Sequence, residues 1–138
     1  MNELKLAKVR KTFDTFIAVQ NFSLNVAHGE FVSLLGPSGC GKTTTLRMIA
    51  GLEKPTQGCI TLGEKTFADL ENSVFLPPEK RNIGMVFQSY AIWPHKTVFQ
   101  NVAYPLKIKK MAKAEIKERV RSKTGLDLEE EIEVAGRD

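Results

Sequence analysis

Residues 36–43, with the sequence GPSGCGKT, restrict what this chain can fold into more than any other feature. They match the pattern G-x-x-x-x-G-K-S/T at every fixed position. Glycines let such a loop curl so that successive backbone N–H groups point inward at phosphate oxygens, and a helix that begins at its end adds partial positive charge. The loop therefore predicts a nucleotide phosphate site, provided that it leaves a buried strand and opens a helix.

The flanking segments predict that strand and that helix. Residues 31–35 form a short, mostly apolar run, which is typical of a parallel strand buried on both faces. Residues 43–50 carry Leu46, Ile49 and Ala50 on one helical face, and Gly51 stands where a C-terminal cap belongs. We therefore expect the order strand, glycine loop, helix.

Apolar patterns elsewhere predict further strands. They lie at residues 4–9, 17–19, 22–26 and 59–62, with a turn at residues 28–29. A second mostly apolar run, at residues 83–87, predicts another buried parallel strand and ends in Gln88. The fold class is therefore α/β.

Two helices are predicted after Gln88. Thr97 with Gln100 three residues later forms a capping-box pattern, and Pro105 should make this helix short or bent. The second should run over residues 112–123, with Glu115 and Arg119 as a supporting pair.

Composition excludes several classes of protein. The chain has 138 residues, 42% of them apolar and 26% charged, which indicates a soluble globular chain of at most one ordinary domain. No apolar stretch approaches the about 20 residues of a membrane span, and the first ten residues lack a signal core, so a cytoplasmic location is expected. Cys40 and Cys59 are not spaced like metal ligands, and we expect neither a disulfide nor zinc.

The net charge of +4 also has a simple interpretation. Residues 107–123 hold eight basic and two acidic side chains, but they lack interleaved aromatic residues and carry Met111, Ile116 and Val120 at helical spacing. This pattern favours the solvated face of an amphipathic helix, and we expect no nucleic-acid partner.

Each position of the loop has an expected role. Lys42 should lie on the β and γ phosphates, the Thr43 hydroxyl should complete the shell of a Mg²⁺ ion, and Thr44 should donate to the α phosphate. Cys40 supplies the small residue needed there, which favours packing over redox chemistry. The full set of expected phosphate-binding positions is Gly36, Pro37, Ser38, Gly39, Cys40, Gly41, Lys42, Thr43 and Thr44.

The loop, residues 50–53 (AGLE) and residues 86–91 (VFQSYA) together resemble the ATP-binding subunits of ABC transporters, especially sugar, ferric-ion and polyamine importers. The likeness runs from about residue 4 to about residue 122. It implies a P-loop NTPase core with an antiparallel β subdomain and the start of a helical subdomain. Residues 1–105 would belong to the core, and residues 106–138 would begin the helical subdomain and end in an acidic tail.

The resemblance implies ATP and Mg²⁺ as ligands and assigns two more residues. Gln88 matches the family's Q-loop glutamine, which joins the Mg²⁺ shell and approaches the attacking water. Lys42 and Gln88 would then be the catalytic residues, and both would act electrostatically. Phe13 matches the position of the aromatic residue that stacks on adenine. The alternative is that Phe13 is a core residue and Phe16 takes the exposed role.

The resemblance also implies partners. Residues 90–97 match the region that faces the membrane-spanning subunit, although Tyr90 and Trp93 could equally pack under this loop, and Lys96 stands where an apolar residue is usual. A second ATP-binding subunit would complete the assembly, on the inner face of the cell membrane.

The resemblance ends before several family motifs. The chain contains no Ser-Gly-Gly signature, and neither Asp69 nor Asp127 follows an apolar strand as a Walker B aspartate does. A catalytic glutamate and a switch histidine are also unassigned. We therefore expect a truncated, amino-terminal part of the ATP-binding, energy-coupling subunit of an importer, which binds Mg-ATP without turnover alone. The alternatives are a short regulatory module that docks on a transporter and an unrelated P-loop kinase, which should lack the sequence around Gln88.

Overall fold

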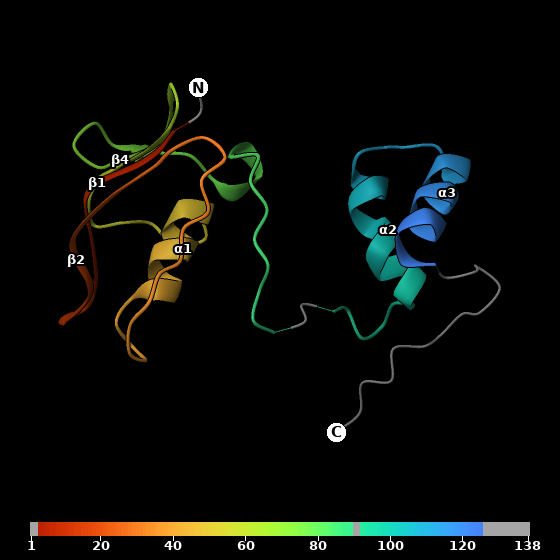
Figure 1. The fold of residues 1–138 in the computed structure, drawn as a ribbon, viewed down its shortest axis with the longest axis horizontal. Helices are drawn as coiled ribbons and strands as arrows, with labels where there is room; N and C mark the ends of the chain where they lie inside the picture. The colour runs from red at the N-terminus through yellow and green to blue at the C-terminus, as the bar shows by residue number, and fades with distance from the viewer. Residues whose placement is uncertain (1–2, 90–91, 126–138) are drawn as a thin grey trace. The chain divides into compact units, whose positions relative to one another are not determined.

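The computed structural model describes residues 3–89 and 92–125. The chain divides into two compact units, Met1–Val86 and Phe87–Asp138, and each is described by itself (Figure 1). The first unit contains β1 (Leu4–Phe13), β2 (Phe16–Val26), α1 (Lys42–Ala50), β3 (Gln57–Leu62), β4 (Lys65–Asp69), β5 (Val74–Phe75) and a short 3-10 turn (Pro78–Lys80). The second contains α2 (Val98–Ile108) and α3 (Lys113–Thr124).

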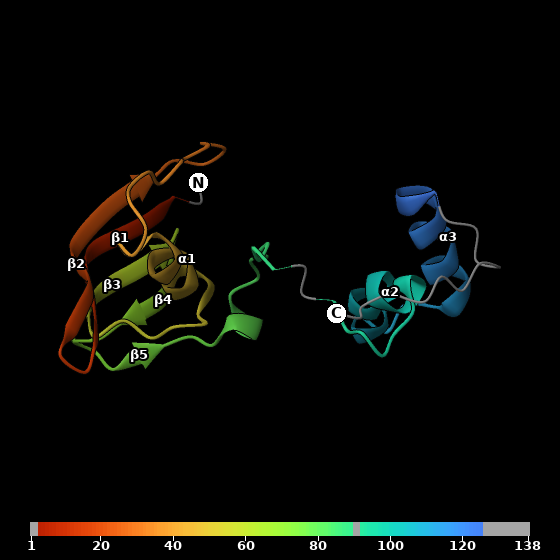
Figure 2. The same cartoon turned by 90° about the horizontal axis from the view of Figure 1, so that it is seen from below.

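The first unit is built on one antiparallel sheet with the strand order β2-β1-β3-β4-β5 (Figure 2). Met48 of α1 joins the apolar side chains of the strands in one core, so α1 packs on this sheet. The fully buried members of the core are Leu6, Val9, Met48, Ile60, Phe67 and Ala68. The sheet therefore fixes the position of the helix that follows the glycine loop.

The strands around the loop partly follow the predictions. The predicted strands at residues 4–9 and 59–62 lie within β1 and β3, and those at 17–19 and 22–26 are parts of the single strand β2. β4 and β5 were not predicted. They are short, and in β4 only Phe67 and Ala68 are buried, so their apolar pattern is too brief to predict a strand.

The helix prediction at the loop is confirmed, but only part of the expected face packs against the core. Gly51 ends α1 in the left-handed conformation at φ 82°, as a C-terminal glycine cap does. The side chains of α1 that are buried are Thr45 and Met48, whereas Leu46 is 48% exposed. Of the expected face, Leu46 therefore points away from the core, whereas Ile49 is partly buried and packs against it.

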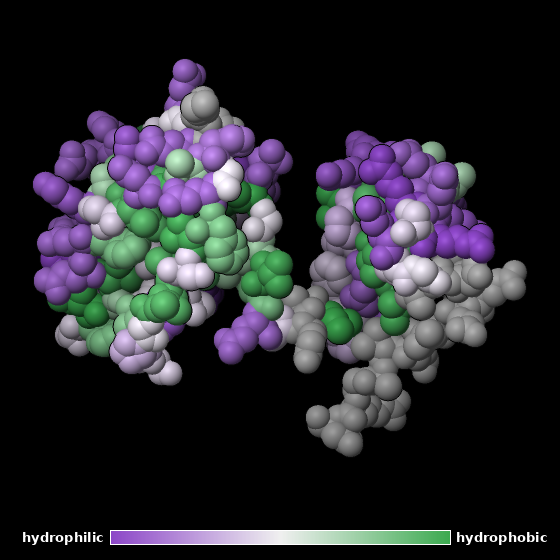
Figure 3. All heavy atoms as spheres, in the orientation of Figure 1, coloured by the Kyte–Doolittle hydropathy of each residue, from purple (hydrophilic) through white to green (hydrophobic). Residues whose placement is uncertain are grey.

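The two predicted parallel strands are also wrong for the described residues. Residues 31–35 and 83–87 have no strand assignment, and Phe31, Leu35 and Val86 are 91%, 92% and 98% exposed. A strand needs a hydrogen-bonded neighbour, and within residues 3–89 and 92–125 no segment pairs with either run. Apolar side chains gather in the middle of the visible face of the first unit (Figure 3).

The second unit is a helical hairpin. Thr97 and Gln100 form the predicted capping box at the start of α2, and the helix continues past Pro105 to Ile108. The predicted second helix is α3, in which Arg119 pairs with Glu115 at 3.1 Å and Gly125 caps the end. Ile116 and Val120 are buried against Ala103, which confirms the amphipathic interpretation. Neither of these helices nor α1 is long and apolar enough to cross a membrane.

Candidate functional site

The conformation of the loop before α1 depends on glycines with left-handed backbone angles. Gly39 and Gly41 have φ angles of 79° and 90°, in the left-handed region that glycine adopts without strain. A Cβ atom on Gly41 would also meet the backbone carbonyl of Ala18 in β2 and lie 2.9 Å from Val19 Cγ2. The glycine pattern therefore lets the loop lie directly against β2 where α1 begins.

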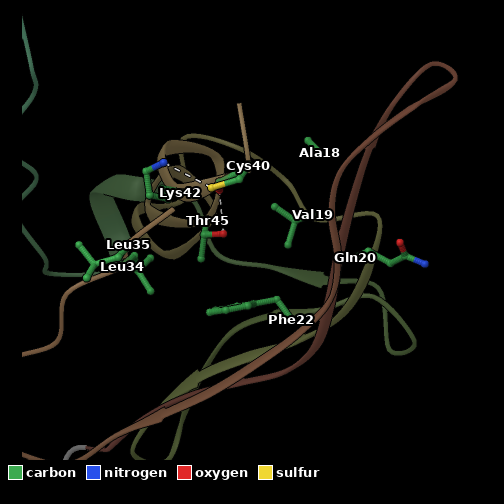
Figure 4. A pocket seen from close by; sticks show the side chains of 10 residues that line it. Ala18, Val19, Gln20, Phe22, Leu34, Leu35, Cys40, Lys42 and Thr45 are labelled. Atoms are coloured by element: carbon green, nitrogen blue, oxygen red, sulfur yellow. Dashed lines mark hydrogen bonds between the residues drawn. The ribbon is translucent and has the colours of Figure 1, made fainter. Parts of the chain in front are cut away.

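Lys42 places a positive charge inside this loop. Its Nζ donates hydrogen bonds of 2.7 Å to the carbonyl oxygens of both Gly36 and Pro37. It also lies 3.3 Å from Cys40 Sγ (Figure 4). A phosphate oxygen is a charged acceptor and forms stronger hydrogen bonds with an ammonium than neutral carbonyls do. The loop thus holds a cation that an anionic ligand can draw into charge-assisted hydrogen bonds.

The described residues form two cavities that border the loop. One, of about 270 Å³, is lined by Phe13, Phe16, Ala18, Gly39, Gly41, Lys42, Thr43 and Thr44. The other, of about 210 Å³, lies between β2 and the start of α1 and is lined in part by Val19, Phe22, Leu34 and Thr45 (Figure 4). The first cavity combines two aromatic rings with several of the expected phosphate-binding positions, a composition that suits a nucleotide.

Both candidate stacking residues line this cavity. Phe13 at the end of β1 is 42% exposed, and Phe16 at the start of β2 is 61% exposed. Phe13 is therefore outside the core, and the β1–β2 turn brings both rings to the loop. The contribution of Ala18 was missed, because a backbone contact between β2 and the loop leaves no signal in the side-chain pattern.

The remaining predicted residues belong to the second unit. Gln88 is exposed in a bend before α2, and its Mg²⁺-binding role stays a prediction. Tyr90 lies outside the described residues. The Trp93 ring is 39% exposed and lies 4.5 Å from the Tyr104 ring, with the Lys96 ammonium over both. Trp93 thus packs on α2 and still presents apolar surface.

Asp69 is the last residue of β4, a strand in which the buried Phe67 and Ala68 follow the polar Lys65 and Thr66, so it does not end an apolar strand. Its carboxylate accepts hydrogen bonds from the Asn72 side chain at 2.8 Å and from the backbone N–H groups of Glu71 and Asn72. These bonds lower the pKa of Asp69, with the Asn72 side chain as the main cause. The carboxylate therefore stabilises the turn after β4, and we assign it no role toward Mg²⁺.

The glycine loop, the lysine within it and the aromatic-lined cavity beside it define a P-loop nucleotide-binding protein. The protein-family model "ABC transporter" matches residues 19–135, and the chain belongs to this family, as the resemblance predicted.

Individual relatives agree with this assignment. The chain is 56% identical to the trehalose/maltose import ATP-binding protein MalK of Thermococcus litoralis over 121 residues, 88% of this chain and 32% of the relative. It is 51% identical to the spermidine/putrescine import ATP-binding protein PotA of Acetivibrio thermocellus, over 85% of this chain and 32% of the relative. The chain therefore spans about a third of the length of these relatives.

Solved structures give the same result for the fold. The bacterial ABC transporter cassette MJ0796, solved as a dimer, is 35% identical and superposes with a TM-score of 0.73 over 86% of this chain and 54% of the cassette. A second structure of that cassette, described as a post-hydrolysis state bound to ADP and Pi, gives a TM-score of 0.72. The predicted fold class, an ABC ATPase-like P-loop core, is confirmed.

Proposed function

We propose that this chain binds Mg-ATP as part of the ATP-binding subunit of an ABC import system. The observation that carries the proposal is the cavity in which Phe13 and Phe16 lie beside Lys42, Thr43 and Thr44. A flat apolar base needs the rings, and a polyphosphate needs the cation and the backbone donors of the loop. The import function is inferred from the relatives, which are import ATP-binding proteins.

Each residue of the proposed site suits a different part of Mg-ATP. Lys42 exchanges the carbonyls of Gly36 and Pro37 for oxygens of the β and γ phosphates, and the first N–H groups of α1 take the other oxygens. The Thr43 hydroxyl is a hard oxygen ligand of the kind that Mg²⁺ prefers, and an ion held at the phosphate loop would neutralise phosphate charge. The side-chain oxygen of Gln88 is of the same kind, and its role toward Mg²⁺ is the one that the family resemblance implies. Phe13 or Phe16 holds the adenine.

A membrane-spanning subunit is the proposed partner of the second unit. Ile92 and Trp93 are 46% and 39% exposed, and Asn101 holds their loop in place. The Asn101 side chain accepts from the Trp93 N–H at 2.9 Å and donates to the carbonyls of Trp93, Lys96 and Thr97 at 3.0–3.2 Å. A loop with an exposed aromatic ring is a suitable contact surface. The protein would then lie on the cytoplasmic face of the membrane, with a second ATP-binding subunit beside it.

Titration calorimetry with Mg-ATP tests the proposal. Lys42→Ala removes the charge-assisted hydrogen bonds, which contribute about 1.5 to 3 kcal/mol, so we expect affinity to fall by roughly 10- to 150-fold. Lys5→Ala is the matched control, because Lys5 is a surface lysine of β1 that pairs with Glu3 at 3.6 Å. Equal affinity of the wild type and Lys42→Ala, both folded, would show that the loop is not the binding site.

A further inference from the structure

Arg81 is an arginine side chain buried in the first unit, with 1% of its surface exposed. Burial of a charge is unfavourable unless hydrogen bonds or an opposite charge compensate for it. Among the described residues none of the ion pairs involves Arg81. Its guanidinium instead lies over the rings of Phe67 and Phe75, at 5.0 and 5.1 Å from their centroids. The remaining compensation must come from backbone carbonyls.

Four hydrogen bonds supply that compensation, and two of them end on α1. Nη1 donates to the carbonyls of Met48 and Ile49 at 2.7 and 2.8 Å. Nε donates to Leu76 O at 2.7 Å, and Nη2 donates to Phe67 O in β4 at 3.1 Å. The one side chain thus connects the C-terminal end of α1 to the sheet.

The C-terminal end of a helix is where a cation is most effective. The last four carbonyls of a helix lack partners within it and carry about half a negative charge in total. Gly51 is required beside this contact, because a Cβ atom there would lie 2.6 Å from Arg81 Nε. The chain therefore leaves space at the end of α1 for the guanidinium.

The opposite end of the same helix carries the phosphate site. Lys42 is the first residue of α1, which has only nine residues, whereas isolated helices shorter than about 12 residues are marginal in water. The helix direction and the position of its first N–H groups must therefore be fixed by tertiary contacts. Arg81 holds one end, while Thr45 and Met48 are buried along its length.

We propose that Arg81 is a positioning residue for nucleotide binding, which fixes α1 on the sheet so that the loop and Lys42 lie correctly for phosphate. The inference rests on the proposed function of the loop. Arg81 does not touch the ligand and acts only through α1. Loss of its side chain should therefore weaken Mg-ATP binding beyond what a comparable loss of stability causes.

The test compares Arg81→Ala with Ile60→Ala in the 138-residue chain. Ile60 is a fully buried core residue of β3, so its truncation destabilises the same unit without removing a hydrogen bond to α1. For the folded fraction of each variant, we expect Arg81→Ala to bind Mg-ATP roughly tenfold more weakly, a change of about 1.4 kcal/mol, and Ile60→Ala to bind normally. Equal affinities of folded Arg81→Ala and wild type would overturn the proposal.

Chemical rescue provides a readout that general destabilisation does not affect. Methylguanidinium at about 10 mM, far below the molar range in which guanidinium denatures proteins, can fill the space left by the side chain. It should restore ATP affinity in Arg81→Ala and leave Ile60→Ala unchanged. An equal effect on both variants would show that Arg81 only adds stability. If Arg81→Ala does not fold, Arg81→Met keeps most of the volume, and its folded form should show the same roughly tenfold loss.

Amide hydrogen exchange separates failure of this inference from failure of the proposed function. The exchange rates of the amides of residues 48–53 are measured without nucleotide in the wild type, Arg81→Ala and Ile60→Ala. We expect the increase over the wild-type rate to be larger in Arg81→Ala than in Ile60→Ala. If Arg81→Ala exchanges faster but the wild type does not bind Mg-ATP, Arg81 does hold α1 and the loop is not a nucleotide site. Unchanged exchange would reject the role of Arg81.

Discussion

The ammonium group of Lys11 forms an ion pair with the Glu53 carboxylate at 2.6 Å, and the same ammonium lies 4.6 Å from the centroid of the Phe13 ring. The ion pair links β1 to the segment after α1, so it connects the strand that carries Phe13 with the helix that carries the phosphate loop. Both side chains are largely buried, at 12% and 23% exposure. This arrangement holds one face of Phe13 against a cation and leaves the ring at the wall of the cavity.

Phe13→Ala should therefore weaken Mg-ATP binding. Stacking of a base on an aromatic ring contributes about 1 to 3 kcal/mol, which corresponds to roughly 5- to 150-fold in affinity. Phe13→Tyr keeps the ring and should bind normally. Phe16→Ala is the comparison in the same cavity, and a larger loss in Phe16→Ala than in Phe13→Ala, measured by titration calorimetry, would assign the stacking role to Phe16.

Gly41→Ala should destabilise the protein more than Gly29→Ala. Both glycines have left-handed φ angles, 90° and 78°, so both variants should lose about 1 to 2 kcal/mol from backbone strain. Only at Gly41 does the added Cβ meet the Ala18 carbonyl, whereas nothing lies within 4 Å at Gly29. Urea unfolding of the two variants measures the difference, and equal losses would mean that the loop does not lie against β2.

The chain alone should be marginally stable and should self-associate. Phe31 and Leu35 are 91% and 92% exposed, and residues 31–35 form no strand with any other described segment. An apolar segment that is unpaired in this way invites pairing with other chains. Differential scanning calorimetry with light scattering measures both properties. A monomer that unfolds cooperatively above about 60 °C, beyond the middle of the usual mesophile range, would contradict this prediction.

ATP turnover by this chain alone should stay at background even where ATP binds. Hydrolysis needs a positioned water and a base in addition to phosphate contacts, and loss of a base alone costs about 10² to 10⁴ in rate. No residue is assigned as that base, and the Asp69 carboxylate is engaged in the turn after β4. Phosphate release is measured with Lys42→Ala as the contamination control. Turnover near about 1 s⁻¹ that disappears in the variant would show that an unrecognised acidic residue acts as the base.

The sequence by itself determined the features that depend on neighbours along the chain. The phosphate loop, the glycine cap at Gly51, the capping box at Thr97 and the Glu115–Arg119 pair each need particular residues at fixed spacing, so their local pattern predicts them. The family could be predicted for the same reason, since its motifs are short and continuous.

Only the tertiary structure decided which residues far apart in the sequence come into contact. The apolar run at residues 31–35 has the pattern of a buried strand, but strand formation requires a second segment to accept and donate its hydrogen bonds. The burial of Arg81 could not be predicted either, because an arginine is usually solvated and its acceptors, Met48 O and Ile49 O, lie more than thirty residues earlier in the chain. Its position depends on the packing of β4 and β5 next to α1, and pairing between distant segments leaves no periodic signal in the sequence.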